Sequence, residues 1–173
     1  MLLRISEKFG RHYRLKSLER EEPPRPFPLT WNVDLRAWGK QLLVLATEEY
    51  TLFSVLLAMN RARSVEAFQE AFRGRLKQLL ENIGWWQLPH LPMITFAKRQ
   101  NRSIIGSQND LRRLTGAHLQ DMPVPVSAGA LQQVEMKINQ APMSYLGMES
   151  PDRALLNASR KPLFNNGRGP FKL

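Results

Sequence analysis

The sequence contains no cysteine, which excludes disulfides, thiolate metal ligands and cysteine nucleophiles. It also lacks a long hydrophobic run. The longest apolar stretches, Leu42–Ala46 and Val55–Met59, are far shorter than the roughly 20 residues that cross a bilayer. The first ten residues carry Arg4, Glu7 and Lys8, so they lack the apolar centre of a signal peptide. We therefore expect a cytoplasmic protein that has no membrane partner.

Patterns of enzyme chemistry are also scarce. The three histidines, His12, His90 and His118, are too far apart in sequence to form a recognisable zinc motif. Glu48 and Glu49 are adjacent, and adjacent side chains of a strand point to opposite faces, so they do not form a pair of cooperating carboxylates. The sequence predicts no metal site and no cofactor.

What the chain does have is apolar content and positive charge. Its 173 residues are 43% hydrophobic and 9% aromatic, which is enough for one globular domain with a substantial core. We expect a single domain over residues 1–159, followed by a basic, flexible tail over residues 160–173. The formal net charge is +10, and residues 91–120 contain five Lys or Arg against one acid. Such an excess favours attraction to polyanions.

Alternating polarity predicts strands in the first third of the chain. Polar Asn32, Asp34 and Arg36 alternate with apolar residues between Trp31 and Ala37, the period-2 pattern of a half-buried strand. Further strands are expected at Leu2–Ile5, Leu42–Thr47, Tyr50–Met59 and Met93–Ala97, with turns at Trp38-Gly39-Lys40 and Glu48-Glu49. The strands from Trp31 to Met59 are predicted to form an antiparallel meander.

Helical spacing predicts one dominant helix after Ser64, which is a good N-cap residue. The apolar residues that follow recur every three or four positions: Val65, Phe68, Phe72, Leu76, Leu79, Leu80 and Ile83. Shorter helices are expected at Glu7–Leu18, after Ser127 and after Ser150-Pro151. The predicted fold is therefore α+β, with a small antiparallel sheet packed on one long amphipathic helix and extra short helices around it.

The segment Lys98–Arg113 carries the most distinctive pattern. Basic residues lead into Gly106 and Ser107, and Ser107 stands three residues before Asp110, the spacing of a helix capping box. We expect a helix to begin at Ser107. Its exposed N–H groups suit a phosphate oxygen, and Gly106 allows a close backbone approach. The predicted phosphate-binding residues are Lys98, Arg99, Asn101, Arg102, Ser103, Gly106, Ser107, Arg112 and Arg113. The alternative is that Gly106, Ser107 and Asp110 form only a structural helix cap.

The residues from Asn101 to Asp110 read N-R-S-I-I-G-S-Q-N-D, which resembles the N-R-S-x-x-G-S-x-N-D signature of a family of small bacterial proteins of unknown function. Asn139–Ser144 is similar to a later segment of that family, and Asn32 stands where its members often carry histidine. The resemblance covers about Leu2 to Asn157. It implies a bacterial or mobile-element origin and a shared α+β fold, but no activity, and an acid–base role at position 32 is not carried over.

Three functions remain open on the sequence. The first is binding of nucleic acid, RNA included, or another polyanion through the predicted phosphate-binding residues. The second is a metal-independent nuclease or toxin-like hydrolase that uses Arg102, Asp110 and His118. The third is a protein–protein interaction module whose basic face meets an acidic protein partner. The sequence does not fix the oligomeric state.

Overall fold

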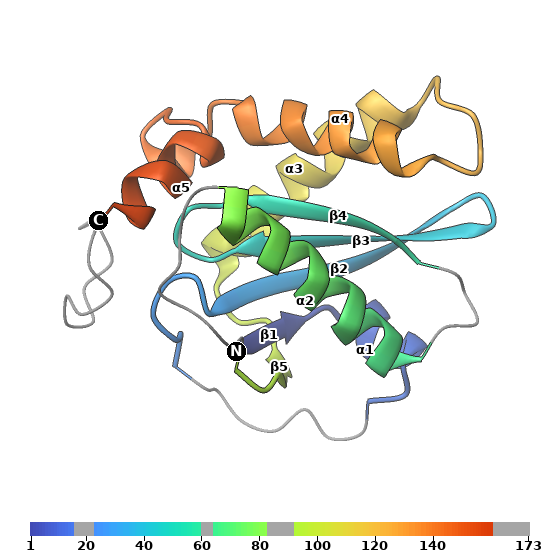
Figure 1. The fold of residues 1–173 in the computed structure, drawn as a ribbon, viewed down its shortest axis with the longest axis horizontal. Coiled ribbons are helices and arrows are strands. Elements are labelled where there is room, and N and C mark those ends of the chain that lie inside the picture. Colours follow the sequence, from blue (N-terminus) through green and yellow to red (C-terminus); the bar gives the residue numbers. More distant parts are fainter. Residues whose placement is uncertain (16–22, 60–63, 83–91, 161–173) are drawn as a thin grey trace.

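The computed structural model describes residues 1–15, 23–59, 64–82 and 92–160. Five strands form one sheet in the order β4-β3-β2-β1-β5 (Figure 1). β2 (Thr30–Trp38), β3 (Gln41–Glu48) and β4 (Ser54–Met59) form the predicted antiparallel meander.

The sheet is mixed, which corrects the predicted antiparallel arrangement. β1 (Leu2–Ile5) runs parallel both to β2 and to β5 (Thr95–Lys98). Parallel neighbours require a crossover connection rather than a hairpin. The chain supplies one between β1 and β2, because α1 (Glu7–His12) and a long connection separate the two strands.

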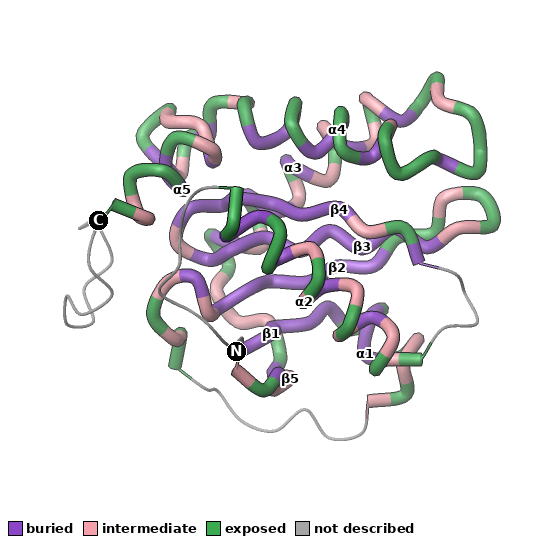
Figure 2. Tube along the Cα trace, in the orientation of Figure 1, coloured by how far each residue is buried: buried purple, intermediate pink, exposed green. Residues whose placement is uncertain are grey.

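One face of the sheet is covered by α1 and by α2 (Val65–Asn82). Ser64 caps α2 as expected, since its Oγ accepts a hydrogen bond of 3.3 Å from the backbone N–H of Ala67. The apolar stripe of α2 then meets the sheet: the rings of Phe72 and Trp31 pack edge to face with centroids 5.3 Å apart. Trp31, Phe68 and Phe72 on this face are fully buried. Figure 2 shows that the strands of the sheet are largely buried.

The opposite face is covered by α3 (Arg102–Leu119) and α4 (Ala128–Gln140), followed by the short helix η1 (Ser144–Leu146) and by α5 (Pro151–Ser159). Its apolar contacts join sheet residues such as Leu45 and Leu56 to Leu111 and Val134 on the helices. α2 and α3 are both 18 residues long, so no single helix dominates the fold.

The outer edge of β4 is covered by side chains of α4. Glu135 accepts a hydrogen bond of 2.9 Å from the backbone N–H of Leu56 and also pairs with Arg75 of α2. Burial raises the pKa of Glu135, while the Leu56 N–H and Arg75 lower it in part. An open strand edge is a template for pairing with another chain, and here Glu135 occupies the N–H group of Leu56 on that edge.

Other local predictions are confirmed or fall outside the described residues. Ser127 caps α4 through a 3.2 Å bond from the N–H of Ala130, and Pro151 opens α5. The first predicted helix ends at His12, earlier than expected. Ile83 of the predicted helix and residues 161–173 of the predicted tail lie outside the described residues.

Candidate functional site

The helix that follows β5 begins earlier than the sequence predicted. Asn101 is its N-cap: the side-chain Oδ1 accepts hydrogen bonds from the N–H groups of Ser103 and Ile104, at 3.1 and 3.3 Å. Ser107 lies inside α3 and is buried. The prediction of a helix start at Ser107 is therefore wrong. Asn101 competes as an equally good cap, and starting there places Ile104 in the buried stripe of α3.

The predicted capping box does not form either. Asp110 lies on the exposed side of α3 and pairs with Arg113 across 3.3 Å. Gly106 occupies a helical position with no atom within 4 Å of where a Cβ would lie. The phosphate site expected at a helix start near Ser107 is thus absent, and the N–H groups of Ser103 and Ile104 are already taken by Asn101.

Beneath α3, a row of polar side chains crosses the sheet. Arg4 of β1 pairs in register with Asn32 of β2, Asn32 with Thr47 of β3, and Thr47 with Ser54 of β4. At most 4% of the surface of any of the four residues is exposed. We call these four residues the polar row. A buried polar group is costly unless it is hydrogen-bonded, so the row needs partners from the helices above it.

Two amide side chains contact the row, mostly through the backbone of its strands. Nε2 of Gln108 donates to the backbone carbonyl of Asn32 at 2.8 Å and to Oγ1 of Thr47 at 3.2 Å. Asn139 of α4 accepts from the N–H of Ser54 at 2.8 Å and donates to its carbonyl at 2.7 Å. Gln108 and Asn139 belong to the two segments that carry the family resemblance. In the structure, these two segments, far apart in the sequence, contact neighbouring strands of the sheet.

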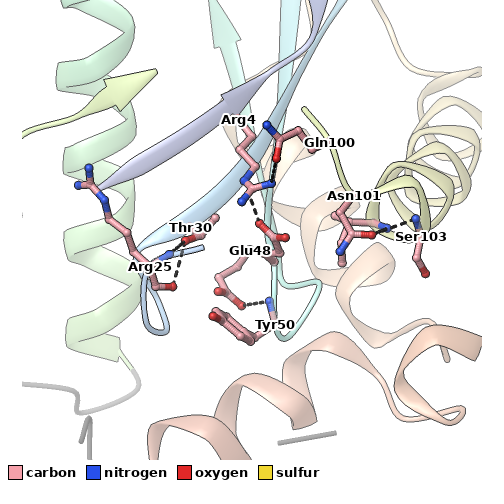
Figure 3. A network of polar contacts seen from close by, with 10 residues as sticks. Arg4, Arg25, Thr30, Glu48, Tyr50, Gln100, Asn101 and Ser103 are labelled. Carbon is pink, nitrogen blue, oxygen red and sulfur yellow. Dashed lines mark hydrogen bonds and ion pairs between the residues drawn. The ribbon is translucent and has the colours of Figure 1, made fainter. Parts of the chain in front are cut away.

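At the β1 end of the polar row, Arg4 and Glu49 form a buried ion pair at 3.4 Å. Arg4 also donates to the side-chain oxygen of Gln100, and Asn101 lies nearby at the start of α3 (Figure 3). Burial raises the pKa of Glu49, and Arg4, Asn101 and Asn32 lower it in part. The Asn32 side chain thus helps to lower the pKa of Glu49, although neither of its polar atoms makes a well-aligned hydrogen bond.

Glu48 was expected in an exposed polar turn, but it is fully buried at the end of β3. Its Oε2 accepts hydrogen bonds from the N–H groups of Tyr50 and Thr51 and from the hydroxyl of Thr51, at 2.8–3.0 Å (Figure 3). Burial raises the pKa of Glu48 to about 8, even though these bonds act in the opposite direction. The carboxyl group holds the β3–β4 turn through Oε2, and its Oε1 is buried without a hydrogen bond.

Beyond the polar row, arginines gather around Asp34 of β2, which is nine-tenths buried. Arg99 and Arg112 lie 3.9 and 3.7 Å from its two carboxylate oxygens. Burial lowers the pKa of Arg99; Asp34 raises it and Arg112 lowers it further. Arg36, two residues along the same strand, lines a small pocket together with Asp34 and Arg112. We call Arg36, Arg99 and Arg112 the arginine cluster.

The remaining predicted phosphate-binding residues are mostly on the surface. Lys98, Arg102, Ser103, Gly106 and Arg113 are exposed, whereas Ser107 is not. Arg36 was not among the predicted residues. Its signal was available, because Arg36 and Asp34 alternate with apolar residues on one strand and so lie on the same face.

The three residues considered for hydrolysis are not brought together. Arg102, Asp110 and His118 lie on α3 at intervals of eight residues, which is about 12 Å of helix axis per interval. Among the residues that the structure describes, no group of three His, Asp or Glu side chains is arranged to hold a metal ion. Within the same residues, no helix is long and apolar enough to cross a membrane.

Comparison with known families matches residues 2–154 to a domain of unknown function, DUF6933. The chain belongs to this family. The match contains both segments that carry the resemblance, as well as the polar row and the arginine cluster. A comparison with curated proteins finds no match.

Proposed function

We propose that this protein binds the phosphate backbone of a nucleic acid, RNA included, through the exposed side of α3 and the neighbouring end of β2. The observation that carries the proposal is the arginine cluster: the guanidinium groups of Arg99 and Arg112 lie beside the single carboxylate of Asp34, and Arg36 lines the same pocket. One carboxylate neutralises one guanidinium, so the cluster keeps a net positive charge. Arginine is well suited to phosphate, because its planar fork offers paired donors.

The members of the cluster have different parts in this proposal. The side chain of Arg99 is only 13% exposed and pairs with Asp34, so it acts as a fixed positive charge behind the surface. Arg112 is 41% exposed and Arg36 is exposed, so both reach solvent. Asp34 orients Arg112, which reduces the conformational entropy that the arginine loses on binding.

The distribution of acidic residues supports the same surface as the phosphate-binding surface. Among the described residues, the acids Asp34, Glu48, Glu49 and Glu135 are buried. They therefore place little negative charge on the exposed side of α3. Lys98 and Arg102 extend the positive region from the arginine cluster to the first turn of α3, and both are exposed.

Gly106 gives further support. A glycine inside a helix costs about 1 kcal/mol relative to alanine. Internal packing does not require a glycine at this exposed position, since a Cβ there would have no atom within 4 Å. A bare helix surface between Arg102 and the arginine cluster lets a phosphate backbone approach closely.

The experiment compares two triple variants of equal net charge. The test variant is Lys98→Gln, Arg102→Gln, Arg112→Gln, and the control makes the same change at Lys8, Lys137 and Arg153, which are exposed on α1, α4 and α5. Arg99 is kept, because removing one partner of a buried ion pair destabilises the fold. Affinity for labelled single-stranded RNA and DNA is measured by fluorescence anisotropy at several salt concentrations.

We expect the test variant to lose affinity and the plot of log affinity against log salt to become shallower, by about one unit per lost phosphate contact. The control should keep most of its affinity. Equal losses in the two variants would show that only net charge matters. No binding by the unaltered protein at low salt would overturn the proposal and favour an acidic protein partner, to be sought by pull-down after nuclease treatment.

A further inference from the structure

The pocket beside the arginine cluster contains an aromatic side chain that the phosphate contacts do not use. Trp38, at the end of β2, lines it together with Arg36 and Gly116 of α3. The guanidinium carbon of Arg36 lies 5.2 Å from the centroid of the Trp38 ring. One face of this indole is therefore covered by an exposed, charged side chain rather than by the apolar core.

Gly116 makes room for that arrangement. A Cβ at this position would lie 2.9 Å from Nη1 of Arg36, which is too close for an ordinary contact. The atom that the Cβ would meet is the end of a flexible side chain, so a larger residue here would displace the Arg36 guanidinium. Gly116 differs in this respect from Gly106, which has open space around it.

The indole N–H of Trp38 is buried and has no hydrogen-bond acceptor in the described structure. Such a donor costs about 1–3 kcal/mol when it is left unpaired. The wall of the pocket thus offers an aromatic ring covered by the Arg36 cation, and the apolar side chains of Leu43 and Leu45. This combination suits a flat, aromatic group that is attached to an anion.

We propose that Trp38 stacks one base of a single-stranded nucleic acid, in the place that the Arg36 guanidinium occupies in the structure. The present pocket is too small for a base, so Arg36 must swing outwards, and there it can pair with a phosphate beside Arg112. In this exchange, stacking of the base on Trp38 replaces the cation–π contact of Arg36. The Arg36 guanidinium and the phosphate then pair with each other. This inference rests on the proposed function and adds a base contact to it.

The test measures whether bases contribute to affinity beyond the phosphates. Labelled 12-nucleotide single strands of uridine or thymidine are compared with an abasic strand of the same length and charge. Stacking of one base predicts that the intact strands bind roughly ten-fold more tightly than the abasic strand. The uridine and thymidine strands distinguish RNA from DNA as the source of the base.

Two variants locate the contact. Trp38→Leu should lower affinity for the intact strand to the abasic level and leave abasic affinity unchanged. Gly116→Leu should do the same, because the new side chain displaces Arg36 and fills the pocket. Gly74→Leu on α2, where a Cβ would have no atom within 4 Å, is the matched control and should change neither affinity. Thermal unfolding checks that each variant is folded.

The outcomes separate this inference from the proposed function. If intact and abasic strands bind equally, with the same salt dependence, phosphate binding stands and the stacking role of Trp38 is overturned. If folded Trp38→Leu and Gly116→Leu proteins keep the preference for intact strands, a base contact exists elsewhere and Trp38 is again excluded. If no strand binds even at low salt, both proposals fail.

Discussion

The two faces of the sheet are built from different chemistry. On the α1 and α2 face, aromatic and aliphatic side chains such as Trp31 and Phe72 make an apolar core. On the α3 and α4 face, the polar row lies among apolar contacts and is covered by Gln108 and Asn139. Burial of apolar side chains stabilises the fold whatever their exact orientation. A buried amide avoids a cost in free energy only where its N–H and C=O groups form hydrogen bonds.

This difference between the two faces explains what holds α3 and its basic side chains in position. A movement of α3 along its axis by one residue of rise, about 1.5 Å, would separate Gln108 from Asn32 and Thr47. Buried polar groups left without partners penalise such shifts. The apolar face therefore supplies most of the stability, and the polar face determines where α3 and its basic side chains lie.

The largest expected effect tests the apolar face. Phe72→Ala removes a fully buried ring and leaves a cavity, so we expect the free energy of unfolding to fall by about 3–5 kcal/mol. Urea denaturation followed by circular dichroism measures it. Phe72→Leu is the milder comparison and should cost less. A loss below about 1 kcal/mol for the alanine variant would contradict the role of this face as the main source of stability.

A somewhat smaller effect tests the polar face. Asn139→Ala leaves the N–H and the carbonyl of Ser54 buried without their side-chain partner. We expect a loss of about 2–3 kcal/mol in the free energy of unfolding. Gln140→Ala, one position along α4 and exposed, is the control and should change stability by less than about 0.5 kcal/mol. Equal losses of stability in the two variants would mean that the hydrogen bonds from Asn139 to the β4 edge contribute nothing to the free energy of unfolding.

The buried carboxyl group of Glu48 predicts a pH dependence. Its pKa is raised from 4.5 to about 8 in the folded state, so between these values the folded protein binds more protons than the unfolded chain. Its contribution to stability is therefore complete below pH 4.5 and is lost as the pH rises to about 8. The slope reaches at most about 1.4 kcal/mol per pH unit.

Glu48→Gln should remove that slope and keep the acceptor for Tyr50 and Thr51, so the stability of the variant relative to the unaltered protein should rise with pH. Chemical denaturation at pH 5, 7 and 9 measures this difference. Glu70→Gln changes the same charge on the exposed side of α2 and should give a nearly constant difference. A constant difference for Glu48→Gln as well would show that Glu48 is ionised throughout.

The smallest effect separates stability from binding. Gly106→Ala removes a glycine from a helix interior where a methyl group meets no other atom, so stability should increase by about 0.5–1 kcal/mol. Under the proposed function, the same methyl group should weaken nucleic-acid binding. Gly74→Ala on α2, where a Cβ would also have no atom within 4 Å, is the matched control: it should raise stability similarly and leave binding unchanged. Unchanged binding by Gly106→Ala would remove Gly106 from the proposed surface.

Much of the fold followed from local pattern. The period-2 alternation around Asp34 predicted β2, and the spacing after Ser64 predicted α2. Ser127 and Pro151 correctly marked the starts of α4 and α5. These signals succeed because a strand or an amphipathic helix repeats its buried face at a fixed interval, and because caps act on the N–H groups of their own first turn.

The sequence by itself determined the elements, the basic character and the absence of thiol chemistry. Only the tertiary structure decided that β1 pairs in parallel with two strands, that Asn101 rather than Ser107 begins α3, and that Asp34 pairs with arginines from two separate segments. Local signals cannot make these choices. Each depends on which of several acceptable caps or partners lets residues far apart in the chain share one buried face, and that choice exists only when the whole chain is packed.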